Sequence, residues 1–192
     1  MWNIVSKPLE AISEAKNEKD MGKTLLVLLV AAIMVAISTF FYARSVTGSV
    51  FLAAIVGAIV AYILVLVLGF VLKLTMKILV GRDDYLSALI PAVYSFFILG
   101  LGTLVASILG LIPSIVGPIL VFIVLLIAYV MSQAVFFKAM MEFYETDAIT
   151  VFIALLIVYI SLFVALYSAT MSALIGFVGK FGGMAGGMIP GF

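Results

Sequence analysis

The residues that could do chemistry are charged side chains, which gather in few places after the first 23 residues. One group occupies residues 73–85 and includes Arg82, Asp83 and Asp84, and a second occupies residues 138–147. Their carboxylates could meet at a membrane surface and bind a divalent cation through oxygen ligands. Helix caps and solvated loop charges explain the same residues more simply. We therefore expect no catalytic, cofactor or metal site there.

The same groups form a candidate partner surface on the cytoplasmic side of a membrane. Its expected residues are Arg82, Asp83, Asp84, Lys138 and Glu142.

Several chemistries are excluded by residues that the chain lacks. It has no histidine and no cysteine, so a zinc site, a thiolate nucleophile and a Ser–His pair are not available. No apolar stretch has an ionisable side chain near its middle, where proton-coupled carriers usually place one. No basic block is long enough to bind nucleic acid.

Hydroxyl and amide groups within the apolar stretches need hydrogen-bond partners, because hydrocarbon offers none. The simplest interpretation is that they join helices to one another. The alternative is a polar pocket between the third and fourth apolar stretches, lined by Tyr94, Tyr129 and Gln133.

The elements that carry these residues are membrane helices. The 192 residues are 67% hydrophobic and 10% charged, with a mean hydropathy of +1.43. Soluble domains carry roughly 25% charged residues, and a bilayer-spanning helix needs about 20 apolar residues. We therefore predict an all-α, polytopic membrane helical bundle with five transmembrane helices and no soluble domain.

The predicted organisation has three parts. Residues 1–23 form a cytoplasmic N-terminal segment, either a solvated leader or an amphipathic helix in the interface, and not a cleavable signal peptide. Residues 24–179 form the transmembrane domain, and residues 180–192 a flexible tail rich in Gly and Met. The five predicted spans are residues 24–43, 50–72, 85–111, 119–137 and 147–178.

Small residues at four-residue spacing predict close helix contacts in three of the spans. Such spacing keeps the small residues on one stripe and lets helix backbones approach each other. The contacts could lie within one chain or between chains, and we favour the first. The expected packing residues are Gly57, Gly102, Ala106, Gly110, Ala165 and Ala169.

Lysine and arginine predict the orientation. Four lie in the N-terminal segment, three in the second loop and one in the fourth, against one in the first loop and one in the tail. Positive charge is retained in the cytoplasm. The N-terminus is therefore predicted to be cytoplasmic and the C-terminus outside.

Three motifs resemble the Yip1-type family of membrane proteins. Pro8-Leu9-Glu10-Ala11-Ile12 is similar to a proline-led amphipathic start before the first span. Gly81 to Tyr94 resembles the family's glycine, aromatic and small-aromatic order, with Tyr85 and Val93-Tyr94. Phe137-Lys138-Ala139 through Thr146 is similar to the link before its last span.

This resemblance implies a non-enzymatic integral membrane protein with five spans. Eukaryotic members are linked to vesicle trafficking and prenylated small GTPases, but the long hydrophilic N-terminal region of those members is nearly missing here, so we do not expect GTPase binding. We expect a multi-pass scaffold of the cell membrane that organises the membrane, interacts with lipids or binds proteins. Its expected partners are membrane lipids and a second copy or another membrane protein. The alternatives are a transporter or channel for a small or lipidic substrate and, more remotely, an enzyme acting on lipid headgroups.

Overall fold

The computed structural model describes residues 7–43, 49–112 and 116–186, and these residues fold into helices without any strand. The all-α prediction is confirmed. In chain order the helices are α2 (Pro8–Glu18), α3 (Met21–Ala43), α4 (Val50–Val80), α5 (Tyr85–Leu109), α6 (Val116–Tyr144) and α7 (Ala148–Gly186).

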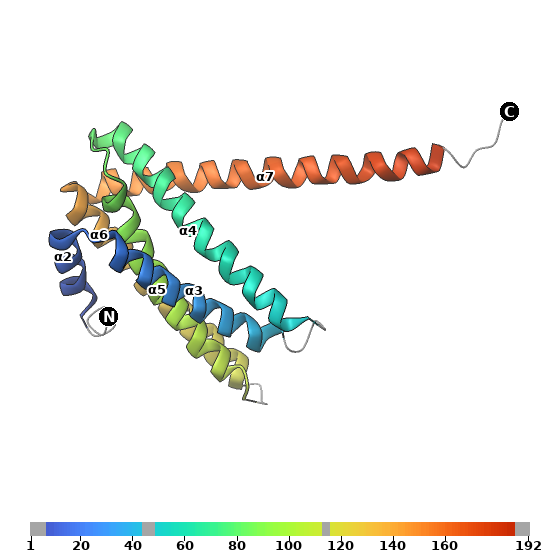
Figure 1. Ribbon diagram of the computed structural model, residues 1–192, viewed down its shortest axis with the longest axis horizontal. Coiled ribbons are helices and arrows are strands. Elements are labelled where there is room, and N and C mark those ends of the chain that lie inside the picture. The colour runs from blue at the N-terminus through green and yellow to red at the C-terminus, as the bar shows by residue number, and fades with distance from the viewer. Residues whose placement is uncertain (1–6, 44–48, 113–115, 187–192) are drawn as a thin grey trace. The chain divides into compact units, whose positions relative to one another are not determined.

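The chain forms two units. The first, Met1–Ala154, contains α2 to α6 and the beginning of α7. The second, Leu155–Phe192, contains the rest of α7. In the first unit α3, α4, α5 and α6 form a bundle, with the short helix α2 against α5 and α6 (Figure 1).

Four helices in the described part of the chain are long and apolar enough to cross a membrane: α3, α4, α5 and α6. The apolar part of α7 with described side chains, Ala148–Val164, is shorter than these four. The chain is therefore a multi-pass membrane protein. The fifth span stays a prediction, as does the orientation of the termini.

Helix α5 is the centre of the bundle, since it packs against α3, α4 and α6. Half of the apolar stretch of α5 is buried within the protein, whereas 11% of the apolar stretch of α4 is buried. A helix that is apolar on all sides and mostly uncovered needs a lipid environment. The helix α5 runs continuously through the buried Pro91.

Local sequence sets the helix ends. Gly81 has φ +77°, a left-handed conformation that ends α4 at low cost. Asp84 then caps α5, because its side chain accepts a hydrogen bond from the Leu86 backbone N–H. Asp20 and Asp147 accept equivalent bonds at the starts of α3 and α7.

Two glycines of α4 and α5 allow backbones to approach closely. A Cβ added at Gly102 would lie 2.1 Å from the Cβ of Ala128 on α6, and one at Gly69 would lie 2.9 Å from a methyl of Leu89. Of the expected packing residues, Ala106 is fully buried. Gly57 and Gly110 leave ordinary contact distances to neighbouring side chains. Ala165 and Ala169 lie on α7, outside the residues whose side chains are described.

Two helices extend beyond their predicted ends. The helix α6 continues past Phe137 to Tyr144, so Lys138 and Glu142 lie on the helix and not in a loop, because both residue types favour helix. The helix α7 continues to Gly186, into the segment predicted to be flexible. Extending a formed helix adds one hydrogen bond per residue without a new nucleation cost, which offsets the low helix propensity of glycine. Residues 187–192 of that segment lie outside the described residues.

Candidate functional site

Helix α2 brings lysines to the end of the bundle where α4 ends and α5 begins. Among its described side chains, Ala11 and Ile12 are buried, 4% and 0% exposed, and the helix packs against α5 and α6. Lys19 ends α2 in a left-handed conformation, with φ +40°. Such a backbone is uncommon for a residue with a Cβ. The side chain of Lys19, the residue with this backbone, bonds to Asp84 and Ser87 of the bundle.

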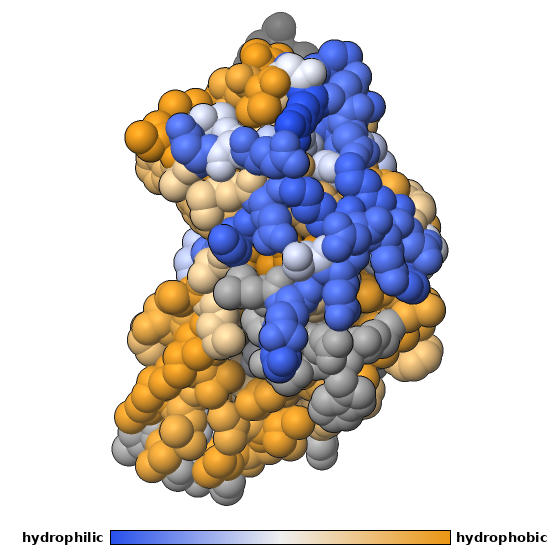
Figure 2. Space-filling view, turned by 90° about the vertical axis from the view of Figure 1, so that its left-hand side faces the viewer, coloured by the Kyte–Doolittle hydropathy of each residue, from blue (hydrophilic) through white to orange (hydrophobic). Residues whose placement is uncertain are grey.

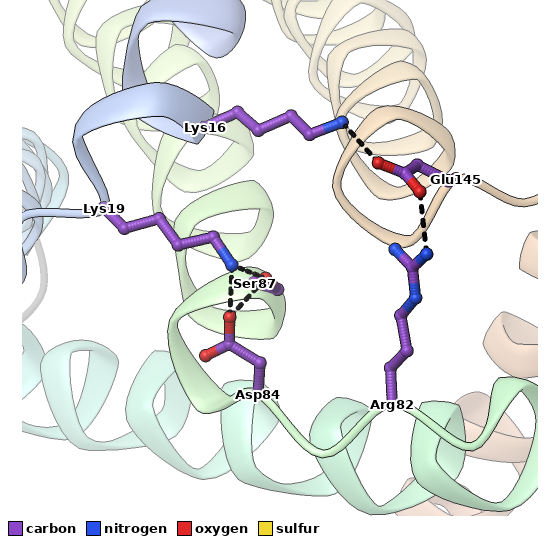
Figure 3. Close-up of polar contacts among 6 residues, drawn as sticks. All are labelled: Lys16, Lys19, Arg82, Asp84, Ser87 and Glu145. Carbon is purple, nitrogen blue, oxygen red and sulfur yellow. Dashed lines mark hydrogen bonds and ion pairs between the residues drawn. The ribbon is translucent and has the colours of Figure 1, made fainter.

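The carboxylate of Asp84 joins α2 to α5 (Figure 3). The Lys19 ammonium forms an ion pair with Asp84 Oδ2 and donates to Ser87 Oγ at 3.0 Å. The Ser87 hydroxyl in turn donates to Asp84 Oδ2 at 2.7 Å. The buried Tyr144 of α6 donates its hydroxyl to the Asp84 backbone carbonyl. Residues from α2, α5 and α6 therefore meet at one residue.

Glu145 makes a second junction, immediately after α6 (Figure 3). One of its carboxylate oxygens lies 2.7 Å from Arg82 Nη2, and the other lies 3.3 Å from Lys16 Nζ. Its backbone is left-handed, with φ +49°, and the Thr146 N–H bonds back to the Met141 carbonyl to close the helix end. This junction links α2, the α4–α5 loop and α6.

Asp83 makes a third junction within the α4–α5 turn. It pairs with Lys73 at 3.0 Å and with Lys77 at 2.6 Å, two lysines on one face of α4. These two ion pairs hold the α4–α5 loop against the last turns of α4. We call these eight residues the charged layer: Lys16, Lys19, Lys73, Lys77, Arg82, Asp83, Asp84 and Glu145.

The electrostatics of the charged layer favour ionised carboxylates. Hydrogen bonds from Lys77 and Lys73 hold the pKa of Asp83 below its usual value, and bonds from Arg82 and Lys16 do the same for Glu145. Partial burial raises the pKa of Asp84, but the bonds from Lys19 and Ser87 outweigh it and leave that pKa below its usual value.

Hydrophilic side chains gather on one face of the molecule, next to large apolar areas (Figure 2). Within the described residues, no three Asp or Glu side chains come together as a metal site. Each carboxylate of the charged layer instead has a lysine or arginine beside it. The arrangement can hold helices together and present charge to lipid headgroups or to a protein.

Three of the five residues of the expected partner surface take part in the ion pairs described above. Arg82, Asp83 and Asp84 all belong to the charged layer. Lys138 is exposed and Glu142 half-buried on α6, and neither forms an ion pair with another described residue.

One of the three residues of the predicted polar pocket lines the hollow between α2, α3 and α5. Tyr94 is half-buried and lines a hollow between α2, α3 and α5, to which neither Tyr129 nor Gln133 contributes. Tyr129 is 53% exposed on α6, and Gln133 is half-buried.

The polar contact between α5 and α6 is made by two buried serine hydroxyls, which join helices as the simplest interpretation of such groups expects. Ser95 and Ser132 have their hydroxyls 2.7 Å apart, and the Ser132 hydroxyl also approaches the Ser95 carbonyl at 3.0 Å. Lys16 and Lys19 of the charged layer, and Ser87 beside it, were not among the predicted site residues. The Asp84-x-x-Ser87 spacing is a local signal for Ser87, whereas no local signal marks the lysines of α2.

The comparison with known families agrees with this architecture. The family model of the Yip1 domain matches residues 2–169. The chain belongs to the Yip1 family. The resemblance seen in the motifs is thereby confirmed, and it covers α2 to α6 and much of α7 of this Yip1 chain. No curated protein and no solved structure is similar enough to count as a match.

Proposed function

We propose that this Yip1-family protein is a non-enzymatic scaffold of the cell membrane, which organises surrounding lipids or binds another membrane protein or a second copy of itself. One observation carries the proposal. Each carboxylate of the charged layer is paired with a lysine or arginine, and these ion pairs join α2, α4, α5 and α6.

The apolar sides of the bundle support the same proposal. Large side chains of α4 are extensively exposed, including Phe51 at 72% and Ile78 at 83%. Such a surface faces lipid or another apolar helix, while the charged layer faces headgroups or a partner's polar surface. The partners of the scaffold are accordingly lipids and membrane proteins, with no nucleic acid.

The interface between α5 and α6 supports a scaffold over a transporter with a slot at that position. Gly102 and Ala128 bring the two backbones into close contact, and the Ser95–Ser132 hydrogen bond satisfies both hydroxyls. An interface with these contacts leaves little room for a polar substrate.

The test is reconstitution into vesicles with two readouts. Native mass spectrometry with lipids retained reports the oligomeric state and the bound lipids, and we expect retained lipids or a discrete oligomer. Uptake is measured in parallel with radiolabelled amino acids, sugars and inorganic ions and with a fluorescent phospholipid analogue, and we expect the rate of empty vesicles.

Two variants make the uptake measurement decisive. Specific uptake that Tyr129→Phe or Gln133→Ala abolishes would overturn the scaffold in favour of a carrier. A chain that retains neither lipid nor a second protein molecule in native mass spectrometry would also contradict the proposal.

A further inference from the structure

A hollow of about 340 Å³ lies between α2, α3 and α5, and none of the described residues that line it belongs to the charged layer. Ligand sites in proteins have volumes of roughly 300–1,000 Å³, so this hollow suits a ligand the size of a lipid headgroup. Its deeper wall is apolar, with Ala11 of α2, Val27 of α3 and Ile90 of α5, each at most 5% exposed. Its rim is polar, with three acidic side chains and one lysine.

Two polar groups of the hollow have no partner among the described residues. The Glu14 carboxylate forms no hydrogen bond or ion pair there, and neither does the Tyr94 hydroxyl. Lys23, the lysine of the rim, is instead paired with Glu18. Asp20 is occupied in capping α3 through the Gly22 backbone N–H. Glu14 and Tyr94 are therefore acceptors available to a ligand.

The hollow is continuous with a lipid-facing stripe of α3. Leu26 lines the hollow and is 51% exposed. Exposed apolar side chains follow it along α3 at helical spacing, so they lie on one face of the helix. These are Leu29, Ile33, Ile37 and Phe40.

We propose that the hollow binds the headgroup of an ethanolamine phospholipid. The primary ammonium lies between the Glu14 carboxylate and the Tyr94 hydroxyl, and one acyl chain follows the α3 stripe from Leu26. The inference deepens the proposed scaffold role, on which it rests, by naming the lipid that the protein retains.

The chemistry of the hollow favours this headgroup over the other common ones. A primary ammonium has three N–H donors, which match the carboxylate and hydroxyl acceptors of Glu14 and Tyr94. A choline headgroup has no donor and is usually held by several aromatic rings, whereas Tyr94 is the one aromatic side chain among the described residues that line this hollow. A serine headgroup adds a carboxylate, which the three acidic groups of the rim repel.

The experiment is native mass spectrometry of the full chain from nanodiscs that contain equal amounts of ethanolamine and choline phospholipids. We expect the ethanolamine lipid to be enriched on the protein, and Glu14→Gln to lower its relative affinity about tenfold through loss of a charge-assisted bond. Tyr94→Phe lowers it less. The matched control is Glu10→Gln, which alters an exposed glutamate on the same helix that is paired with Lys7 outside the hollow.

The N-methylated series of ethanolamine lipids and soluble phosphoethanolamine complete the test. Affinity should fall with each methyl group, and soluble phosphoethanolamine should fail to compete, because the acyl chain contributes to binding. Equal retention of both lipids by the wild type, or equal enrichment by wild type and Glu14→Gln, would overturn the inference. Those results leave the scaffold role standing, whereas solute uptake contradicts the scaffold role whichever lipid is bound.

Discussion

Asp84 has two separable roles, as the cap of α5 and as the ion-pair partner of Lys19. Replacement of an N-cap aspartate by alanine costs about 1 kcal/mol, whereas asparagine caps a helix about as well as aspartate. We expect Asp84→Ala to lower the unfolding temperature in detergent more than Asp84→Asn does. Thermal unfolding followed by circular dichroism or by size-exclusion chromatography measures the difference.

Lys19→Met is the matched control, because it removes the same ion pair and leaves the cap intact. Its effect should resemble that of Asp84→Asn, since exposed ion pairs contribute little to stability. If Asp84→Asn proves as damaging as Asp84→Ala, the cap is not the main contribution of this residue.

Protonation of Asp84 and Glu145 should release α2 from the bundle in acid. Both carboxyl groups have a folded-state pKa below the ordinary value of about 4. Their contribution to holding α2 against the bundle is therefore fully present above that pH. It is lost as the pH falls through the lowered pKa values. Because the chain lacks cysteine, spin labels at Asn17→Cys and Lys138→Cys report the distance between α2 and α6. We expect the same distance at pH 7 and pH 5, and a broader distribution near pH 3.

The double variant Asp84→Asn, Glu145→Gln provides the comparison, since it removes both titrating groups. Its distance distribution should already be broader at pH 7 and should change little with pH. A wild-type distribution that is unchanged at pH 3 shows that the buried Ala11 and Ile12 hold α2 without the ion pairs.

At the scale of helices, the contact between Gly102 of α5 and Ala128 of α6 sets how closely these two helices pack. A Cβ at position 102 would lie 2.1 Å from that of Ala128, so Gly102→Ala forces the backbones apart. Overpacking of this kind costs about 1–3 kcal/mol. We expect a lower unfolding temperature for Gly102→Ala, and partial recovery when Ala128→Gly is added.

Gly57→Ala is the control for helix propensity. Its new Cβ would lie 3.7 Å from Thr39, an ordinary contact, so the gain in helix propensity is not offset by a clash. We expect unchanged or slightly raised stability. Equal destabilisation by Gly57→Ala and Gly102→Ala would mean that the α5–α6 distance is not the cause.

Helices and their caps could be predicted from sequence because they depend on neighbouring residues. Gly81 and Asp84 are such cases: one ends α4 and the other begins α5 through bonds that span a few residues. The four-residue spacing of small residues could not show which glycine lies at a close contact between helices. Such spacing permits close approach, but it does not identify the neighbouring helix. Gly69 lies close to Leu89 although no stripe includes it.

The ion pairs that join distant parts of the charged layer could not be predicted for the same reason. The pair between Lys16 and Glu145 joins residues 129 positions apart and forms only because α2 folds back on α5 and α6. Similarly, Tyr94 was expected to face α6, whereas it lies on the side of α5 that meets α2 and α3. The α5–α6 interface, where Tyr94 was expected, instead contains the hydrogen bond between Ser95 and Ser132.

At the scale of the whole molecule, the position of the charged layer constrains how the chain crosses a bilayer. Lysine and arginine are retained in the cytoplasm, and most of those in this layer lie in the N-terminal segment and the α4–α5 loop. An even number of helices, α3 to α6, separates the N-terminal segment from Asp147. We therefore predict that both lie on the same, cytoplasmic side.

Crossing of the bilayer by α7 would place the C-terminus outside. Fusions of a reporter that is active only in the cytoplasm, made after Asp147 and after Phe192, test this directly. We expect activity for the first fusion and none for the second, with the opposite pattern for a reporter active only outside. Activity of the cytoplasmic reporter at both positions would mean that α7 does not cross and that the protein has four spans. Inactivity at Asp147 would mean that the orientation is inverted, because α3 to α6 return the chain to the side on which it started.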